Sequence, residues 1–111
     1  MTITFAKGKL AREANDFRLL VRIYGERRAK PIRHRLDEMR AADSLADLRT
    51  LPGPRCHELH GDRKGQLSVD LDHPYRLLFV PAEPVPYRSD GGLDWTRVEA
   101  VVILGVEDTH E

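Results

Sequence analysis

The stretch that decides the fold is "LPGPRCHELHGDRKGQLSVDLDHPYRLLFV", residues 51–80. Before Pro54 the apolar residues recur at helical spacing, and after it they alternate with the two-residue period of β-strands. The elements predicted here are a strand over 56–60, a charged turn over 61–65, and strands over 66–71 and 75–80. The sequence therefore divides into a helical half followed by a half that forms sheet.

The residues before this stretch predict one short strand and then helices. Residues 2–6, "TITFA", alternate and are rich in β-branched side chains, which indicates a strand. Helical spacing of apolar residues predicts a helix over 9–24 that ends at Gly25, and a short helix is expected over 44–49. Between them lies a predicted helix over 26–42, whose buried stripe is Ala29, Ile32, Leu36 and Met39.

The last predicted strand covers residues 97–106 and is apolar on both faces over 100–104, which favours a central place in the sheet. The order of elements predicts an α+β fold in which an N-terminal strand and two to three helices pack on one face of a mostly antiparallel sheet. With 111 residues, the chain is expected to form a single domain over 1–111.

Composition excludes several classes of protein. The chain is 41% hydrophobic and 32% charged, which is typical of a globular domain, and no apolar run approaches the length of a membrane span. Its single cysteine cannot form an internal disulfide or a cysteine-based zinc site. We therefore expect a cytoplasmic protein with no membrane partner.

The net charge is zero but it is unevenly distributed. Residues 1–55 carry thirteen Lys and Arg against seven Asp and Glu, or +6, whereas residues 56–111 carry five against eleven, or −6. This distribution is compatible with a basic groove and equally with ordinary solvated helix faces, so charge alone does not identify a partner.

Several residues of the sheet half could catalyse cleavage of RNA. The 2′-hydroxyl must lose a proton as it attacks phosphorus, the leaving 5′-oxygen must gain one, and cations must stabilise the phosphorane. Histidine suits both proton transfers, and the candidates are His57 and His110, with Asp108 beside the latter. Candidate phosphate contacts are Arg63, Lys64 and Arg76. Each of these residues also has an ordinary structural interpretation, as a half-buried histidine, a chain terminus or a solvated turn.

The order of these motifs resembles the RelE/ParE superfamily of toxins from bacterial type II toxin–antitoxin systems, in particular its HigB-like branch. The resemblance rests on "HELHGDRKGQLS", the aromatic-Arg pair that follows it and the terminal "DTH". It implies an α+β toxin fold and a ribosome-dependent endoribonuclease, an mRNA interferase that forms a 2′,3′-cyclic phosphate. It also implies that neither a metal nor another cofactor is needed.

The resemblance assigns roles to individual residues. His57, Asp108 and His110 fall on catalytic positions, and Arg63, Lys64 and Arg76 fall on basic positions that contact phosphates. Thr109 stands where the family has tyrosine, which predicts reduced potency if that tyrosine stacks on a base.

The resemblance also implies partners, namely the ribosome with its mRNA and a helix-turn-helix antitoxin (HigA-like), through which operator DNA is contacted only indirectly. Two other functions are compatible with the sequence. One is inhibition of DNA gyrase without nuclease activity, as in the ParE-like branch, and the other is a non-catalytic regulatory binding module. The histidines favour the nuclease, because neither alternative requires them.

Overall fold

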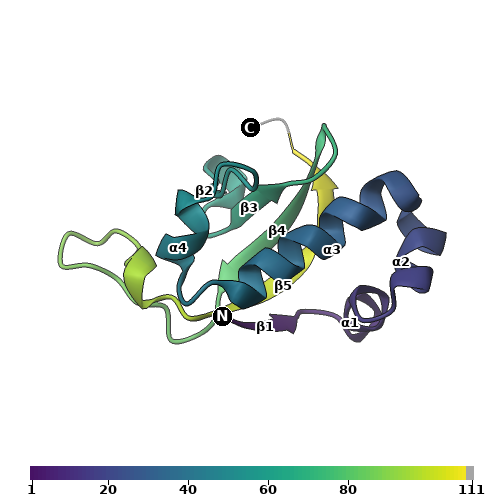
Figure 1. Ribbon diagram of the computed structural model, residues 1–111. Helices are drawn as coiled ribbons and strands as arrows, with labels where there is room; N and C mark the ends of the chain where they lie inside the picture. The colour runs from purple at the N-terminus through teal and green to yellow at the C-terminus, as the bar shows by residue number, and fades with distance from the viewer. Residues whose placement is uncertain (110–111) are drawn as a thin grey trace.

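A computed structural model describes residues 1–109 and has an α+β fold with an open five-stranded sheet (Figure 1). Its helices are α1 (Gly8–Ala14), α2 (Phe17–Tyr24), α3 (Glu26–Ala41) and α4 (Leu45–Thr50). Its strands are β1 (Thr2–Phe5), β2 (His57–Glu58), β3 (Leu67–Asp70), β4 (Tyr75–Pro81) and β5 (Ala100–Asp108), and its short 3₁₀ turns are η1 (Gly61–Arg63) and η2 (Trp95–Arg97). Within these residues no helix is both long and apolar enough to cross a membrane.

The strand order is β1-β5-β4-β3-β2, and only the β1–β5 pair is parallel. The predicted fold class, with its mostly antiparallel sheet, is therefore confirmed. β5 is an inner strand, as its apolar character on both faces predicted, because it pairs with β1 on one side and β4 on the other. β2 is an edge strand of only two residues, shorter than the strand predicted over 56–60.

The core lies between α3 and the face of the sheet that this helix crosses (Figure 1). The four residues of the predicted stripe on α3 are all buried, with Ala29 and Met39 at 0% exposure. They belong to one apolar cluster with sheet residues that include Leu77, Phe79 and Ile103. Burial of each such large side chain stabilises the fold by roughly 1.5–3 kcal/mol. The apolar layer between α3 and the sheet therefore holds the sheet in place against this helix.

The single helix predicted over 9–24 is wrong, because the structure contains two helices that are separated at Asn15 and Asp16. The Asp16 carboxylate accepts hydrogen bonds from the backbone N–H groups of Arg18 and Leu19, at 3.1 and 3.3 Å, and so caps the start of α2. The Asn15 side chain donates to the Ala11 carbonyl at 2.8 Å and helps to end α1. The predicted stop at Gly25 is confirmed, since its N–H closes the last turn of α2 on the Val21 carbonyl.

Candidate functional site

The candidate catalytic and phosphate-binding residues lie mainly on the outer face of the sheet, which we define as the face opposite α3. Side chains alternate between the two faces along each strand, so Ser68 and Asp70 face outward while Leu67 and Val69 enter the core. The strand register forms two rows on the outer face. One row contains His57, Ser68, Leu78 and Gly105, and the next contains Asp70, Arg76 and Glu107.

His57 is half-buried in β2, and its imidazole is oriented by the backbone. Its Nδ1 lies 3.0 Å from the Arg55 carbonyl oxygen, which can only accept a hydrogen bond. Nδ1 of the neutral imidazole therefore carries the proton, and Nε2 is the nitrogen that can accept one. This is the tautomer that a general base working through Nε2 requires.

The carbonyl that orients His57 belongs to a residue in an uncommon backbone conformation. Arg55 has φ +48°, in the left-handed region that residues other than glycine seldom occupy. Such a conformation costs on the order of 1 kcal/mol and persists only where the surrounding contacts maintain it. Here the neighbouring Pro54 carbonyl accepts the Asp70 N–H at 2.7 Å, and the Arg55 guanidinium lies 3.5 Å from the Asp70 carboxylate.

Arg76 is the most buried of the candidate cations, with a side chain that is 16% exposed. Its Nε lies 3.4 Å from Asp70 Oδ1, and its Nη1 donates to Thr109 Oγ1 at 3.1 Å. A guanidinium has five N–H donors in a fixed fork, so within residues 1–109 these contacts leave Nη2 available to a phosphate oxygen.

Arg63 reaches the same row from the end of η1. Its Nη2 donates to Glu107 Oε1 at 2.8 Å, and Glu107 is the cross-strand partner of Arg76. Glu107 therefore lies between two arginines, and a phosphate entering this row would compete with its carboxylate for Arg63. Because the two side chains are 32% and 49% exposed, solvent screens this ion pair and it can exchange partners at low cost.

Three consecutive outward-facing residues of β3 and the turn before it carry buried oxygens that lack a hydrogen-bond partner among residues 1–109. They are Gln66 Oε1, Ser68 Oγ, which belongs to a residue that is 0% exposed, and Asp70 Oδ1, which is compensated by its ion pair with Arg76 Nε at 3.4 Å. A buried oxygen without a partner is costly, and native structures contain few of them. Ribose hydroxyls and base amines are donors that could satisfy such oxygens.

The structure places His57, Arg63 and Arg76 on the outer face of the sheet, whereas the other described candidates, Lys64 and Asp108, lie elsewhere. With about 4.8 Å between strands and about 3.4 Å per residue, the Cα atoms of His57 and Arg76 lie roughly 12 Å apart. Lys64 is exposed and lines a different groove, together with Glu58, Gly65 and Tyr87.

Asp108 pairs with Tyr75, and the alternation along β5 places it on the α3 face, opposite to His57 and Arg76. On that face the Tyr75 ring is covered by the Arg28 guanidinium, 3.4 Å from the ring centroid. His110 lies outside the described residues, so its predicted pairing with Asp108 stays a prediction.

Sequence reasoning missed Glu107, Asp70 and Arg55 as members of this site. Their roles depend on which residues face one another across strands, and the sequence does not specify that register. The position expected to hold the family tyrosine does belong to the site, because Thr109 is 7% exposed and its hydroxyl accepts from Arg76. Thr109 therefore orients a cation instead of offering a ring on which a base could stack.

Two further observations concern other chemistries. Burial raises the pKa of the Cys56 thiol to about 12, so this cysteine is not a nucleophile near neutral pH. In the part of the chain that the structure describes, no group of three or more His, Cys, Asp and Glu residues could hold a metal ion.

The arrangement can therefore bind a phosphate through guanidinium groups and exchange a proton at one imidazole nitrogen. Neither a protein-family model nor a curated protein matches the sequence.

Proposed function

We propose that this chain is the toxin of a RelE/ParE-type toxin–antitoxin pair, of the HigB-like branch, and cuts mRNA on the ribosome in the cytoplasm. The observation that carries the proposal is the convergence of His57, Arg63 and Arg76 on the outer face of the sheet, with the imidazole held in a defined tautomer. The sequence motifs that resemble the family supply the substrate class and the ribosome.

In the proposed reaction the phosphate of the scissile bond lies against the Arg76 row. The 2′-oxygen loses its proton and bonds to phosphorus, the bond from phosphorus to the 5′-oxygen breaks, and that oxygen takes up a proton. His57 Nε2 carries out one of these proton transfers, as base when neutral or as acid when protonated. His110 is assigned the other by resemblance alone. Arg63 and Arg76 stabilise the charge that accumulates on the phosphorane oxygens.

The same proposal includes a neutralising partner, a helix-turn-helix antitoxin through which operator DNA is bound. Reduced potency is expected, because Thr109 contacts Arg76 and cannot stack on a base. The nuclease would then rely on guanidinium contacts and proton transfer to a greater degree than relatives that carry the tyrosine.

The test is growth arrest after induction, with primer extension on a reporter mRNA. The wild-type protein should produce breaks that end in a 2′,3′-cyclic phosphate and that disappear when the reporter lacks a translation start. His57→Ala and His110→Ala should each abolish the breaks, whereas the matched change His73→Ala, in an exposed turn, should leave them unchanged.

Full toxicity of both His57→Ala and His110→Ala would contradict the nuclease. Growth arrest with DNA breaks but intact transcripts would favour inhibition of gyrase instead. An absence of growth arrest in the presence of a confirmed fold would favour a regulatory binding module.

A further inference from the structure

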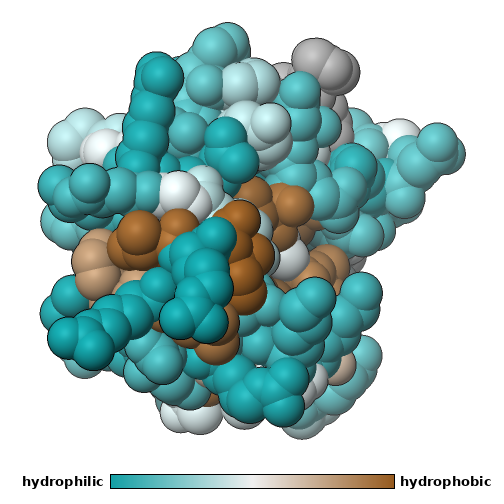
Figure 2. All heavy atoms as spheres, turned by 90° about the vertical axis from the view of Figure 1, so that its right-hand side faces the viewer, coloured by the Kyte–Doolittle hydropathy of each residue, from teal (hydrophilic) through white to brown (hydrophobic). Residues whose placement is uncertain are grey.

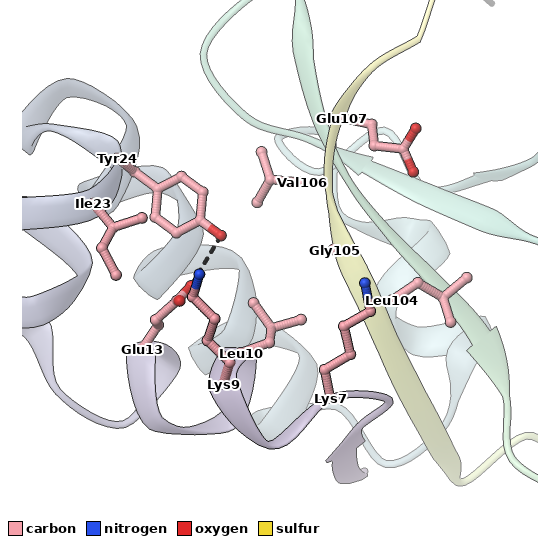
Figure 3. A pocket seen from close by; sticks show the side chains of 10 residues that line it. All are labelled: Lys7, Lys9, Leu10, Glu13, Ile23, Tyr24, Leu104, Gly105, Val106 and Glu107. Carbon is pink, nitrogen blue, oxygen red and sulfur yellow. Dashed lines mark hydrogen bonds between the residues drawn. The ribbon is translucent and has the colours of Figure 1, made fainter.

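A groove at the open edge of β5, which the proposed nuclease reaction does not use, lies beyond the end of β1. β1 pairs with β5 only from Ala100 to Ile103, and no other strand within residues 1–109 covers that side of β5 after Ile103. Instead, α1 and α2 stand away from the strand and leave a hollow of about 360 Å³ (Figure 3).

The backbone of this edge is oriented for pairing. The Leu71 N–H donates to the Tyr75 carbonyl at 3.0 Å, so Tyr75 directs its backbone groups to β3 and the alternate residues Arg76 and Leu78 direct theirs to β5. Their partners Glu107 and Gly105 accordingly turn their N–H and C=O groups toward β4. The intervening Val106 therefore directs its N–H and C=O into the hollow, and within residues 1–109 neither group has a backbone partner. An open strand edge of this kind is a template for an added strand.

The walls of the groove are apolar. Leu10, Ile23 and Val106 line it, and in Figure 3 Val106 points toward Tyr24 across the hollow. Ile23 is 45% exposed, one of few large apolar side chains at the surface of the described residues. Figure 2, which views the end of the molecule where α1 and α2 lie, shows apolar residues gathered in a hollow and surrounded by hydrophilic ones.

The side chains around the groove are mainly basic, which favours an acidic partner. Lys7 and Lys9 line it, and neither has a salt bridge with any residue of 1–109. The same holds for four exposed arginines on or beside α1 and α2, which are Arg12, Arg18, Arg22 and Arg27.

Nearby carboxylates are already engaged. Glu13 is 3% exposed and accepts from the Tyr24 hydroxyl at 3.1 Å, and Asp16 caps α2. Glu107, which also lines the groove, is ion-paired with Arg63 at 2.8 Å. The field at this end of the molecule is therefore positive, and an acidic ligand would complement it.

We propose that the groove binds an extended acidic segment of a partner protein, which adds to the sheet as a sixth strand beside residues 104–107. Such a segment would alternate apolar and acidic residues, because one face of the added strand meets Leu10, Ile23 and Val106 while the lysines lie beside it. The apolar walls and the open backbone edge favour a peptide over RNA, which would need only the cations. This inference does not depend on the proposed nuclease activity.

The probe is a fluorescein-labelled heptapeptide of alternating Glu and Ile, titrated into the full-length protein and followed by fluorescence anisotropy. Its N-methylated counterpart keeps every side chain and charge but loses alternate backbone donors. We expect the heptapeptide to bind and its N-methylated counterpart to bind at least about tenfold more weakly. Equal binding of the two peptides, or no binding, would overturn the proposal.

The variant Lys7→Glu with Lys9→Glu should weaken the heptapeptide about tenfold, because two favourable charge contacts become repulsive. It should remain folded, since acidic residues are favoured at a helix N-terminus such as that of α1. The matched control Arg12→Glu changes charge on the same helix outside the groove and should weaken binding less than about threefold. An equal loss in both variants would show non-specific attraction and overturn the proposal.

Hydrogen exchange distinguishes strand addition from other binding. Bound heptapeptide should slow exchange of the Val106 amide, because that N–H gains a backbone acceptor, and leave the Gly105 amide, already paired with β4, unchanged. Binding without protection of Val106 would overturn the proposal. So would displacement of the heptapeptide by an RNA heptamer at equal concentration, which would make the groove a polyanion site.

Discussion

Under the proposed function, replacement of Glu107 by glutamine is expected to strengthen binding to mRNA on the ribosome, because it removes the carboxylate that pairs with Arg63 Nη2 and competes with phosphate for it. In the native protein Arg63 Nη2 donates to Glu107 Oε1 at 2.8 Å, so each phosphate contact by Arg63 must displace this ion pair. Arg76 lies directly across the strand pair from Glu107, and the substitution therefore also removes a negative charge beside the second guanidinium.

The magnitude follows from counterion release. One added phosphate contact steepens the dependence of log K on log salt by about 0.7 for a single strand. Over a fourfold rise in salt, binding by the variant should then weaken about 2.6-fold more than binding by the native protein. Loss of the ion pair itself should cost only about 0.5 kcal/mol of folding free energy, because its side chains are 32% and 49% exposed.

The measurement is association with ribosomes carrying a labelled mRNA, over a series of KCl concentrations, for Glu107→Gln, Arg63→Gln and a matched control. Arg63→Gln should change the salt slope in the opposite direction. Glu99→Gln makes the same change of charge at an exposed position before β5, and it should leave the slope unaltered. If Glu107→Gln and Glu99→Gln behave alike, or if Arg63→Gln has no effect, Arg63 does not contact phosphate.

Three further predictions concern stability. Burial raises the pKa of the Cys56 thiol from 9.0 to about 12, so as pH rises the thiol loses its proton in the unfolded chain before it does in the folded chain. The contribution of this thiol to the unfolding free energy is therefore full below about pH 9 and is lost as pH rises toward about 12. Urea titrations should show a loss of about 2 kcal/mol from this thiol at about pH 10.5, and an unchanged alkaline decline in Cys56→Ala would contradict the assignment. Asp16→Ala should lower the unfolding free energy by about 1 kcal/mol through loss of the cap on α2, whereas Asp37→Ala, exposed in mid-helix, should not. Leu36→Ala should cost about 2–5 kcal/mol, and a cost no greater than that of the exposed Leu51→Ala would refute the placement of the core.

The helices and strands could be predicted where the spacing of apolar residues along the chain indicates which side chains are buried. The stripe on α3 is an example, because its spacing follows from helix geometry alone and each of its residues is buried. The break between α1 and α2 had a local signal too, since Asp16 before a helical turn is a favoured cap. The apolar spacing over 9–24 continues across this break and so predicted a single helix.

The sequence did not predict which residues of distant strands lie opposite one another in the sheet. β1 is the first strand of the chain and pairs in parallel with β5, the last, which no local pattern specifies. Arg63 and Glu107 are separated by 44 residues in sequence, and their contact exists only because β3, β4 and β5 align in one register. Candidate residues could thus be named from their chemistry, whereas their partners could not.

The composition of the site depends on a single irregularity in β5. Ile103 pairs with Phe79, but Gly105 pairs with Leu78, so one extra residue, Leu104, is accommodated between them. Val101 and Ile103 enter the core, and strict alternation from them would direct residue 107 inward and residue 108 outward. The bulge reverses this order beyond Leu104.

Glu107 and Thr109 consequently share the face of Arg76, while Asp108 is on the other face with Tyr75. An isolated glycine within an apolar strand is a recognised indication of a bulge, and Gly105 was the local signal available in the sequence. Deletion of Leu104 would remove the bulge and leave a regular strand, in which Gly105 still pairs with Leu78 and Glu107 still lies opposite Arg76. Such a variant, if folded, should keep the ion pair from Arg63 to Glu107, and its replacement by a contact from Arg63 to Asp108 would refute this account of how the site is built.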